Sequence, residues 1–208
     1  MVSKKDTLLE KNEPLTNEDK ALFKYFGVNA KIRPPFRILN PERMYIGDNV
    51  SIREEAYMHC YQDLSGNYKF IEEQYKKDFN IEDYYYDSEL IINNEVMIGR
   101  NLFISCTKQI TIENNVTISE RIFIGDNNHS FNHKYVPIMQ QPNKKGNPIY
   151  IGQGSWIAAG AVITHGTKLG RNTVVGANSV VQGEFPDYAV IGDEKAKLLF
   201  IMDKEKRP

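Results

Sequence analysis

The sequence predicts an all-β solenoid built from six-residue repeats. Between residues 151 and 181, every sixth residue is aliphatic, and a small residue stands at the fifth position of each unit. The aliphatic residues are Ile151, Ile157, Ile163, Leu169, Val175 and Val181, and the small ones are Ser155, Ala161, Thr167, Thr173 and Ser179. A fixed short period is typical of stacked solenoids, in which each repeat buries its apolar side chain only against its neighbours.

The same period occurs earlier in the chain, with breaks. One run contains Ile46, Ile52 and Met58; a second contains Ile92, Ile98, Ile104 and Ile110; after a shift of two residues, a third contains Ile112, Ile118 and Ile124. β-branched side chains suit short strands around a narrow interior. Glycine and asparagine recur between them, which predicts tight turns with positive φ. These residues are Gly47, Gly99, Gly125, Gly152, Gly170 and Gly176, with Asn49, Asn101, Asn172 and Asn178.

The remaining segments are expected to be appendages of this solenoid. Residues 1–40 are predicted to form a leader with one short helix near 17–26, because Thr16 and Asp19 resemble a capping box. The solenoid then spans 41–192, and residues 193–208 are expected to form a helix that covers its open end.

Two stretches interrupt the repeat and predict inserted loops at 61–89 and 127–149. The first is rich in tyrosine and acidic residues, and its apolar spacing allows a helix. Its aromatic residues can pack on the solenoid wall or a neighbouring subunit, which we favour, or contact carbohydrate. Loops of this kind often carry function.

Composition excludes several functions. The 208 residues include 26 Lys and Arg against 27 Asp and Glu, so no basic field for nucleic acid exists. No apolar run is long enough for a signal peptide or a membrane span. Cys60 and Cys106 lack the spacing of a metal site, and we expect a cytoplasmic protein that requires no metal.

Over about residues 40–200, the hexads resemble the hexapeptide-repeat acyltransferases. This resemblance implies a left-handed parallel β-helix, an exception to the usual right-handed crossover. It also implies acetyl-CoA as co-substrate and a cyclic homotrimer with sites between subunits. A β-solenoid without catalysis, serving as a scaffold, is the alternative.

The second interruption resembles the active-site loop of the polysaccharide and sialic-acid O-acetyltransferase branch. There, a stretch like Asp126-x-x-His129-Ser130 carries the general base, which implies that role for His129. Imidazole titrates near neutral pH and can take the proton of a hydroxyl as it attacks a thioester. Asp126 or a backbone carbonyl would fix its tautomer, and His133 is the alternative base.

The resemblance also implies residues for substrate and donor. The substrate pocket would include Trp156, Asn128 and His133. Coenzyme A would lie along the later coils, at Ala159, Gly160, Thr164, Ala177 and Lys197. One departure is Lys195, where the family usually has proline, and another is the segment 105–107, which lacks the asparagine of galactoside and maltose acetyltransferases.

Together these features predict an acetyl-CoA-dependent O-acetyltransferase that acts on a saccharide, such as a capsular or surface polysaccharide or its precursor. Direct transfer is expected, without an acyl-enzyme on Cys106. Transfer to the nitrogen of an amino sugar is the alternative within this fold. A carbonic-anhydrase-like zinc site made by His129, His133 and His165 is a further alternative, although the order of these ligands differs from that family.

Overall fold

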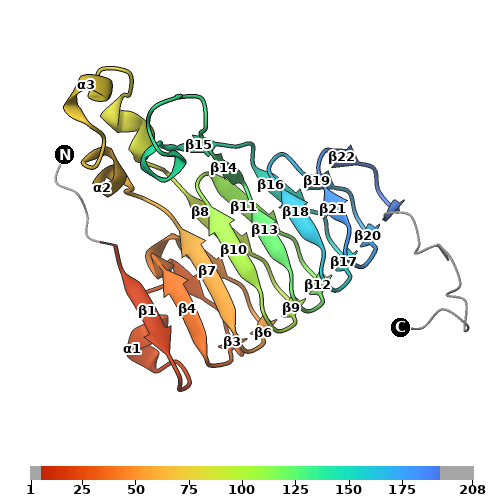
Figure 1. Ribbon diagram of the computed structural model, residues 1–208. Coiled ribbons are helices and arrows are strands. Elements are labelled where there is room, and N and C mark those ends of the chain that lie inside the picture. Colours follow the sequence, from red (N-terminus) through yellow and green to blue (C-terminus); the bar gives the residue numbers. More distant parts are fainter. Residues whose placement is uncertain (1–5, 193–208) are drawn as a thin grey trace, which may run out of the picture.

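The computed structural model describes residues 6–192 as a three-sided β-solenoid (Figure 1). Its walls are three seven-stranded sheets, and every complete coil contributes one strand to each wall. All pairings within the walls are parallel except that of the first strand, β1, which runs antiparallel to β4. The predicted parallel β-solenoid of hexapeptide repeats is therefore confirmed.

The strands of the three walls follow the predicted six-residue spacing. Sheet 1 contains β1 (Leu8–Lys11), β4 (Phe36–Leu39), β7 (Ala56–Cys60), β10 (Phe103–Cys106), β13 (Phe123–Gly125), β18 (Val162–Thr164) and β21 (Val180–Val181). Sheet 2 contains β2 (Tyr25–Phe26), β5 (Met44–Ile46), β8 (Glu89–Ile92), β11 (Gln109–Ile112), β16 (Ile149–Ile151), β19 (Lys168–Leu169) and β22 (Glu184–Phe185). Sheet 3 contains β3 (Lys31–Ile32), β6 (Ser51–Ile52), β9 (Met97–Ile98), β12 (Thr117–Ile118), β17 (Trp156–Ile157), β20 (Val174–Val175) and β23 (Val190–Ile191).

The core is a set of apolar files that run along the solenoid axis. In sheet 2, parallel register places Ile46, Ile92, Ile112, Ile151 and Leu169 in one file. All five side chains are fully buried. Because side chains alternate across a strand, residues next to these in sequence face outward. The aliphatic residue of each hexad is thus the one that fills the interior.

The turn residues behave in two different ways. Asn49, Asn101, Asn172 and Asn178 have φ between 50° and 60°, as predicted. The glycine that follows Ile151 is needed for another reason. A Cβ on Gly152 would lie 2.4 Å from the carbonyl oxygen of Gly170 in the next coil. Positive φ was expected at this position, but close stacking of coils is what excludes a side chain there.

The N-terminal prediction needs a correction, because residues 25–39 form a further coil. Its strands β2, β3 and β4 pair with those of the next coil. The helix expected over 17–26 is a single turn, α1 (Asn17–Lys20), capped by the predicted box of Thr16 and Asp19. Short helical elements also occur elsewhere in the described chain: α2 (Ser65–Tyr68), α3 (Glu73–Lys76), and the 3₁₀ helices η1 (Pro41–Arg43), η2 (Ile81–Tyr84) and η3 (Ile138–Gln140).

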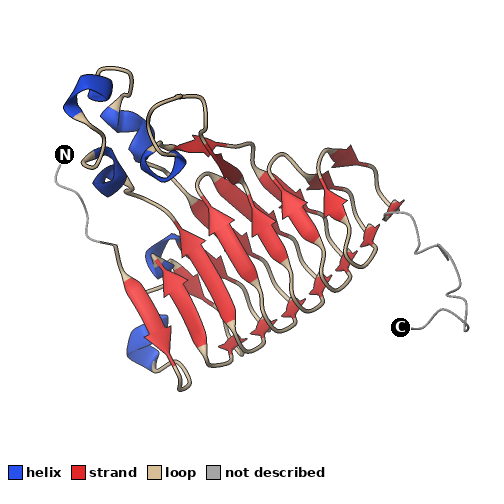
Figure 2. Ribbon diagram, in the orientation of Figure 1, coloured by secondary structure: helices blue, strands red, loops and turns tan. Residues whose placement is uncertain are grey.

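Both interruptions leave the solenoid at the same edge, where sheet 1 meets sheet 2. The first insertion carries α2, α3 and η2, and the second carries β14 (Asn127–His129), β15 (Asn143–Lys145) and η3. The two lie side by side above the walls (Figures 1 and 2). The helix predicted for 193–208 lies outside the described residues. Within residues 6–192, no helix is long and apolar enough to cross a membrane.

Truncation of one inward side chain should destabilise the whole solenoid. Ile110 is fully buried in β11. We expect Ile110→Ala to lower the free energy of unfolding by about 2–5 kcal/mol, because it removes buried methyl groups and leaves a cavity. Urea denaturation would measure this loss, and the dependence of the unfolding free energy on urea concentration should be unchanged. Thr111→Ala, which changes the next, half-buried residue, is the control and should shift the midpoint little.

Candidate active site

The second interruption places His129 on a β-hairpin that stands on the edge between sheets 1 and 2. In this hairpin, β14 and β15 pair antiparallel, and His129 lies opposite Asn143. The returning chain passes close to the wall: a Cβ on Gly146 would lie 1.9 Å from the Asp126 carbonyl oxygen. The Gly166 N–H donates to the Asn147 carbonyl at 3.0 Å. Both ends of the hairpin are therefore fixed to the solenoid.

The imidazole of His129 is exposed and forms no hydrogen bond with the described residues. Strand alternation puts its side chain on the same face of β14 as that of Asn127. The Asn127 amide donates to the carbonyl and hydroxyl oxygens of Ser105, at 2.9 Å each. His129 thus projects from the hairpin on the side of sheet 1, with its nitrogens available to a ligand.

The sequence suggests that Asp126 or a backbone carbonyl orients His129, but the Asp126 carboxylate makes its hydrogen bonds elsewhere. Its fully buried carboxylate accepts hydrogen bonds from the Thr107 N–H at 2.7 Å, the Thr107 hydroxyl at 3.0 Å and the Lys108 N–H at 2.8 Å. The side chain turns into the corner of the preceding coil, so it lies under the hairpin rather than beside the imidazole. Asp126 satisfies backbone donors that the corner would otherwise leave unpaired.

His133, the alternative base, is used to hold the loop. Its Nδ1 accepts from the N–H groups of Tyr135 and Val136, at 3.3 and 3.1 Å. This fixes the neutral tautomer with the proton on Nε2, which lies 3.3 Å from an Asp78 carboxylate oxygen. With both nitrogens engaged, His133 joins the loop to the first insertion and does not offer a free base.

Trp156 and His129 do not meet within one chain. Trp156 is half-exposed on sheet 3, where its indole N–H donates to the Ser119 hydroxyl at 3.2 Å. His129 and the exposed Asn128 instead lie on the hairpin at the opposite edge of sheet 1. A pocket that contains both Trp156 and His129 therefore needs a second subunit.

The predicted donor residues lie along two edges of sheet 1. Thr164 is the strand neighbour of Gly125, at the foot of the hairpin. Ala159, Gly160 and Ala177 lie in the turns between sheets 3 and 1, where they are partly or fully exposed. In these turns, the N–H of Ala159 and of Ala177 has no backbone acceptor among the described residues. Lys197 lies outside the described residues.

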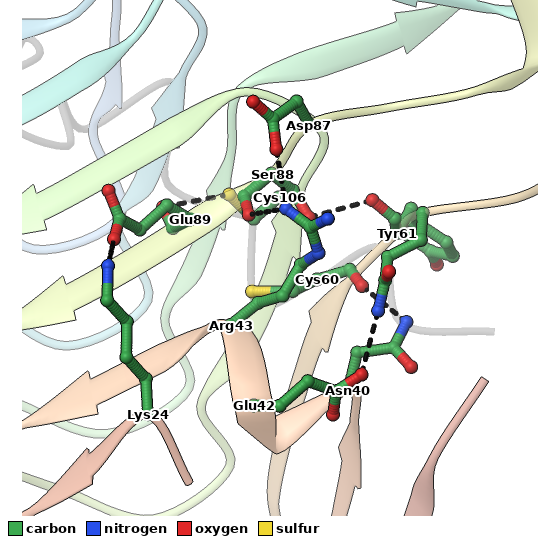
Figure 3. Close-up of polar contacts among 11 residues, drawn as sticks. Lys24, Asn40, Glu42, Arg43, Cys60, Tyr61, Asp87, Ser88, Glu89 and Cys106 are labelled. Atoms are coloured by element: carbon green, nitrogen blue, oxygen red, sulfur yellow. Dashed lines mark hydrogen bonds and ion pairs between the residues drawn. The ribbon is translucent and has the colours of Figure 1, made fainter. Parts of the chain in front are cut away.

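A groove lies beside the first insertion on sheet 2, lined by residues that include Arg43, Lys108 and Pro148. It has a volume of about 640 Å³, and its charged groups are mostly paired with each other (Figure 3). Arg43 binds the Asp87 carboxylate at 2.6 Å, and Lys24 pairs with Glu89. These contacts fasten the C-terminal end of the insertion to the solenoid.

Cys60 and Cys106 form a buried thiol pair on neighbouring strands. The hydrogen bond with Cys60, together with burial, raises the pKa of the Cys106 thiol. A protonated, buried thiol is a poor nucleophile. His59, whose pKa is lowered by burial and by nearby Arg37, lies outward on the same sheet. Among residues 6–192, no three His, Cys, Asp or Glu side chains are arranged to hold a metal ion.

The contacts between the two insertions could not be predicted from the sequence. The Tyr84 hydroxyl donates to the Gln140 carbonyl at 2.9 Å, and the Tyr86 hydroxyl contacts the backbone of Asn143. A small apolar cluster of Ile71, Tyr84 and Val136 lies between them. A run of tyrosines was the only signal, and it carries no information about its partners.

Comparison with known proteins agrees with this fold. Residues 148–183 match the family model described as bacterial transferase hexapeptide (six repeats). No curated protein sequence matches the chain.

Solved structures extend the likeness to most of the chain. AntD, an N-acyltransferase from Bacillus cereus crystallised with dTDP-4-amino-4,6-dideoxyglucose and coenzyme A, is 17% identical, with a TM-score of 0.65 over 89% of this chain and 88% of that one. The hexapeptide-repeat acetyltransferase VCA0836 from Vibrio cholerae O1 biovar eltor, complexed with acetyl coenzyme A, is 21% identical, with a TM-score of 0.54 over 88% and 75%. At these identities the likeness shows the fold alone.

A structural role for Asp126 predicts a loss of stability in Asp126→Asn. The amide would turn one acceptor into a donor that faces backbone N–H groups, and we expect a loss of about 1–3 kcal/mol in unfolding free energy. Chemical denaturation measures this loss, and Asp83→Asn, an exposed change in the first insertion, is the control. Unchanged stability of Asp126→Asn would contradict this structural role.

Proposed function

We propose that this protein is an acetyl-CoA-dependent O-acetyltransferase that acts on a saccharide hydroxyl, with His129 as general base. The observation that carries the proposal is the exposed imidazole of His129, which has no hydrogen-bond partner within residues 6–192, at the break of a hexapeptide solenoid. The likeness to an acetyltransferase complexed with acetyl coenzyme A supports the choice of donor.

In the proposed reaction, an imidazole nitrogen of His129 takes the proton of the acceptor hydroxyl as its oxygen attacks the thioester carbonyl carbon. The tetrahedral intermediate collapses when the carbon–sulfur bond breaks, and the imidazolium returns the proton to the leaving thiolate. No acyl-enzyme is needed. The state of Cys106 supports direct transfer, because its thiol is buried and protonated.

The donor would lie across the outer face of sheet 1, which joins the turns at Ala159 and Ala177 to the foot of the hairpin at Thr164. These turns would offer the coenzyme the N–H groups of Ala159 and Ala177, which have no backbone acceptor in the described part of the chain. On the same face, Tyr57, Phe103 and Phe123 of the earlier strands β7, β10 and β13 form an exposed ladder of stacked rings.

A cyclic homotrimer would complete this site. Trp156 projects from sheet 3 and His129 from the hairpin at the far edge of sheet 1, so a neighbouring subunit must supply one of them if both are to contact the acceptor. Such a subunit would also cover the exposed ring ladder on sheet 1. We place the protein in the cytoplasm, the compartment in which acetyl-CoA is available.

The acceptor we propose is a capsular or other surface polysaccharide, or its precursor. A second candidate is N-acylation of an amino sugar, because AntD is an N-acyltransferase complexed with a dTDP-linked amino sugar. The two products differ in stability: mild base cleaves an acetyl ester and leaves an amide intact. Release of acetate from the purified product would therefore identify the acceptor atom.

Replacement of the base should abolish most activity without unfolding the protein. We expect His129→Ala to lower kcat by about 10²–10⁴-fold, since a positioned base contributes that much. Thiol release from acetyl-CoA with a panel of polysaccharides and sugars is the measurement. His165→Ala is the control, because Gln182 is the one hydrogen-bond partner of its ring among the described residues. Full activity of His129→Ala with loss in Cys106→Ala would contradict direct transfer.

A further inference from the structure

We propose that Tyr86, in the first insertion, is a positioning residue that sets the location of the His129 hairpin through the backbone of Asn143. The inference rests on the proposed role of His129, and its experiment separates the two. It is carried by a pair of hydrogen bonds from one hydroxyl: the Tyr86 hydroxyl donates to the Asn143 carbonyl at 3.1 Å and accepts from the Asn143 N–H at 2.9 Å.

The position of Asn143 makes these bonds important for His129. The two residues are directly opposite in β14 and β15. The Ser130 N–H donates to the Pro142 carbonyl, so the pairs alternate and His129–Asn143 is a pair without mutual hydrogen bonds. The N–H and carbonyl of Asn143 consequently point outward from the hairpin. The Tyr86 hydroxyl satisfies both groups, as a neighbouring strand would.

Tyr86 is suited to hold this place without change over the physiological pH range. Its side chain is buried, and burial raises its pKa to about 12. The phenol therefore stays protonated and can donate and accept at once. The Lys145 ammonium lies 5.5 Å from the centre of the ring, on the same strand as Asn143. Tyr86 thus contacts β15 by its hydroxyl and by its ring.

Hydrogen bonds at the base of the first insertion hold Tyr86 next to the solenoid wall. The Tyr86 N–H donates to the Gln62 carbonyl at 2.8 Å, which joins the two ends of the first insertion. Only two residues separate Tyr86 from β8, and there the Ser88 hydroxyl binds the Tyr61 carbonyl at 2.7 Å. Tyr86 is therefore attached to the solenoid wall and transmits its position to the hairpin.

The hairpin needs such support because β14 and β15 belong to none of the three walls. An isolated two-stranded hairpin is at best marginally stable in water. A displacement of about 1 Å in a reacting group can cost about 10²-fold in rate. Loss of two hydrogen bonds at the residue opposite His129 should thus affect catalysis more than global stability.

The experiment compares Tyr86→Phe with Tyr68→Phe, a matched change whose hydroxyl contacts only Lys76 within the same insertion. We expect Tyr86→Phe to lower kcat by about 10–100-fold, with the KM for acetyl-CoA and the melting temperature nearly unchanged. Amide hydrogen exchange should become faster in 127–130 and 143–145 but not in the solenoid strands. Tyr68→Phe should match the parent protein in all these measurements.

A double mutant separates this inference from the proposed function. If Tyr86 acts through His129, Tyr86→Phe should have no further effect on the residual rate of His129→Ala. The positioning role would be overturned if Tyr86→Phe lowered kcat by the same factor in the parent protein and in His129→Ala. It would also be overturned if Tyr86→Phe left both kcat and hydrogen exchange unchanged. If His129→Ala keeps full activity, the proposed base is wrong, while faster exchange of the hairpin in Tyr86→Phe would still show the structural connection.

Discussion

The stacking of each coil on the next is the interaction on which the rest of the structure depends. Every wall strand from β4 onward obtains its hydrogen bonds from strands about one coil away, and the files of isoleucine and valine are buried only when those strands are in register. A shift of the strand register by one residue would turn each inward side chain outward. The walls consequently tolerate no irregular segment, and both insertions leave at a corner.

The difference between the regular walls and the corner between sheets 1 and 2 explains where a catalytic residue can lie. Side chains of the walls are fixed by the repeat, whereas the corner between sheets 1 and 2 carries two long segments that contact each other. The buried Asp126 secures the corner beneath the hairpin, and the first insertion holds the loop from above through Tyr84, Tyr86 and the His133–Asp78 contact. His129 is the histidine of this loop that is exposed and has no hydrogen-bond partner in the part of the chain that the structure describes.

The repeat could be predicted from the sequence because burial in a narrow interior imposes one residue class at a fixed interval, as in the run from Ile151 to Val181. The coil containing Phe26, Ile32 and Ile38 follows the same interval but was missed, since prolines and a capping box beside it suggested a leader. Asp126 was interpreted as a partner of His129 because the two are close in sequence, yet its side chain turns toward Thr107 and Lys108 in the previous coil. Contacts such as that of Tyr86 with Asn143 join residues 57 positions apart and follow no periodic rule.

The crystal structure of the protein with coenzyme A tests the central claim most directly, because it locates the reacting sulfur. We predict that the coenzyme lies over sheet 1, beside the turns at Ala159 and Ala177, with its thiol next to His129 and room for an acceptor hydroxyl within hydrogen-bond reach of the imidazole, about 2.6–3.2 Å or through one water. Coenzyme A bound instead in the groove at Arg43 and Lys108, with its thiol remote from the hairpin, would contradict the assignment of the site.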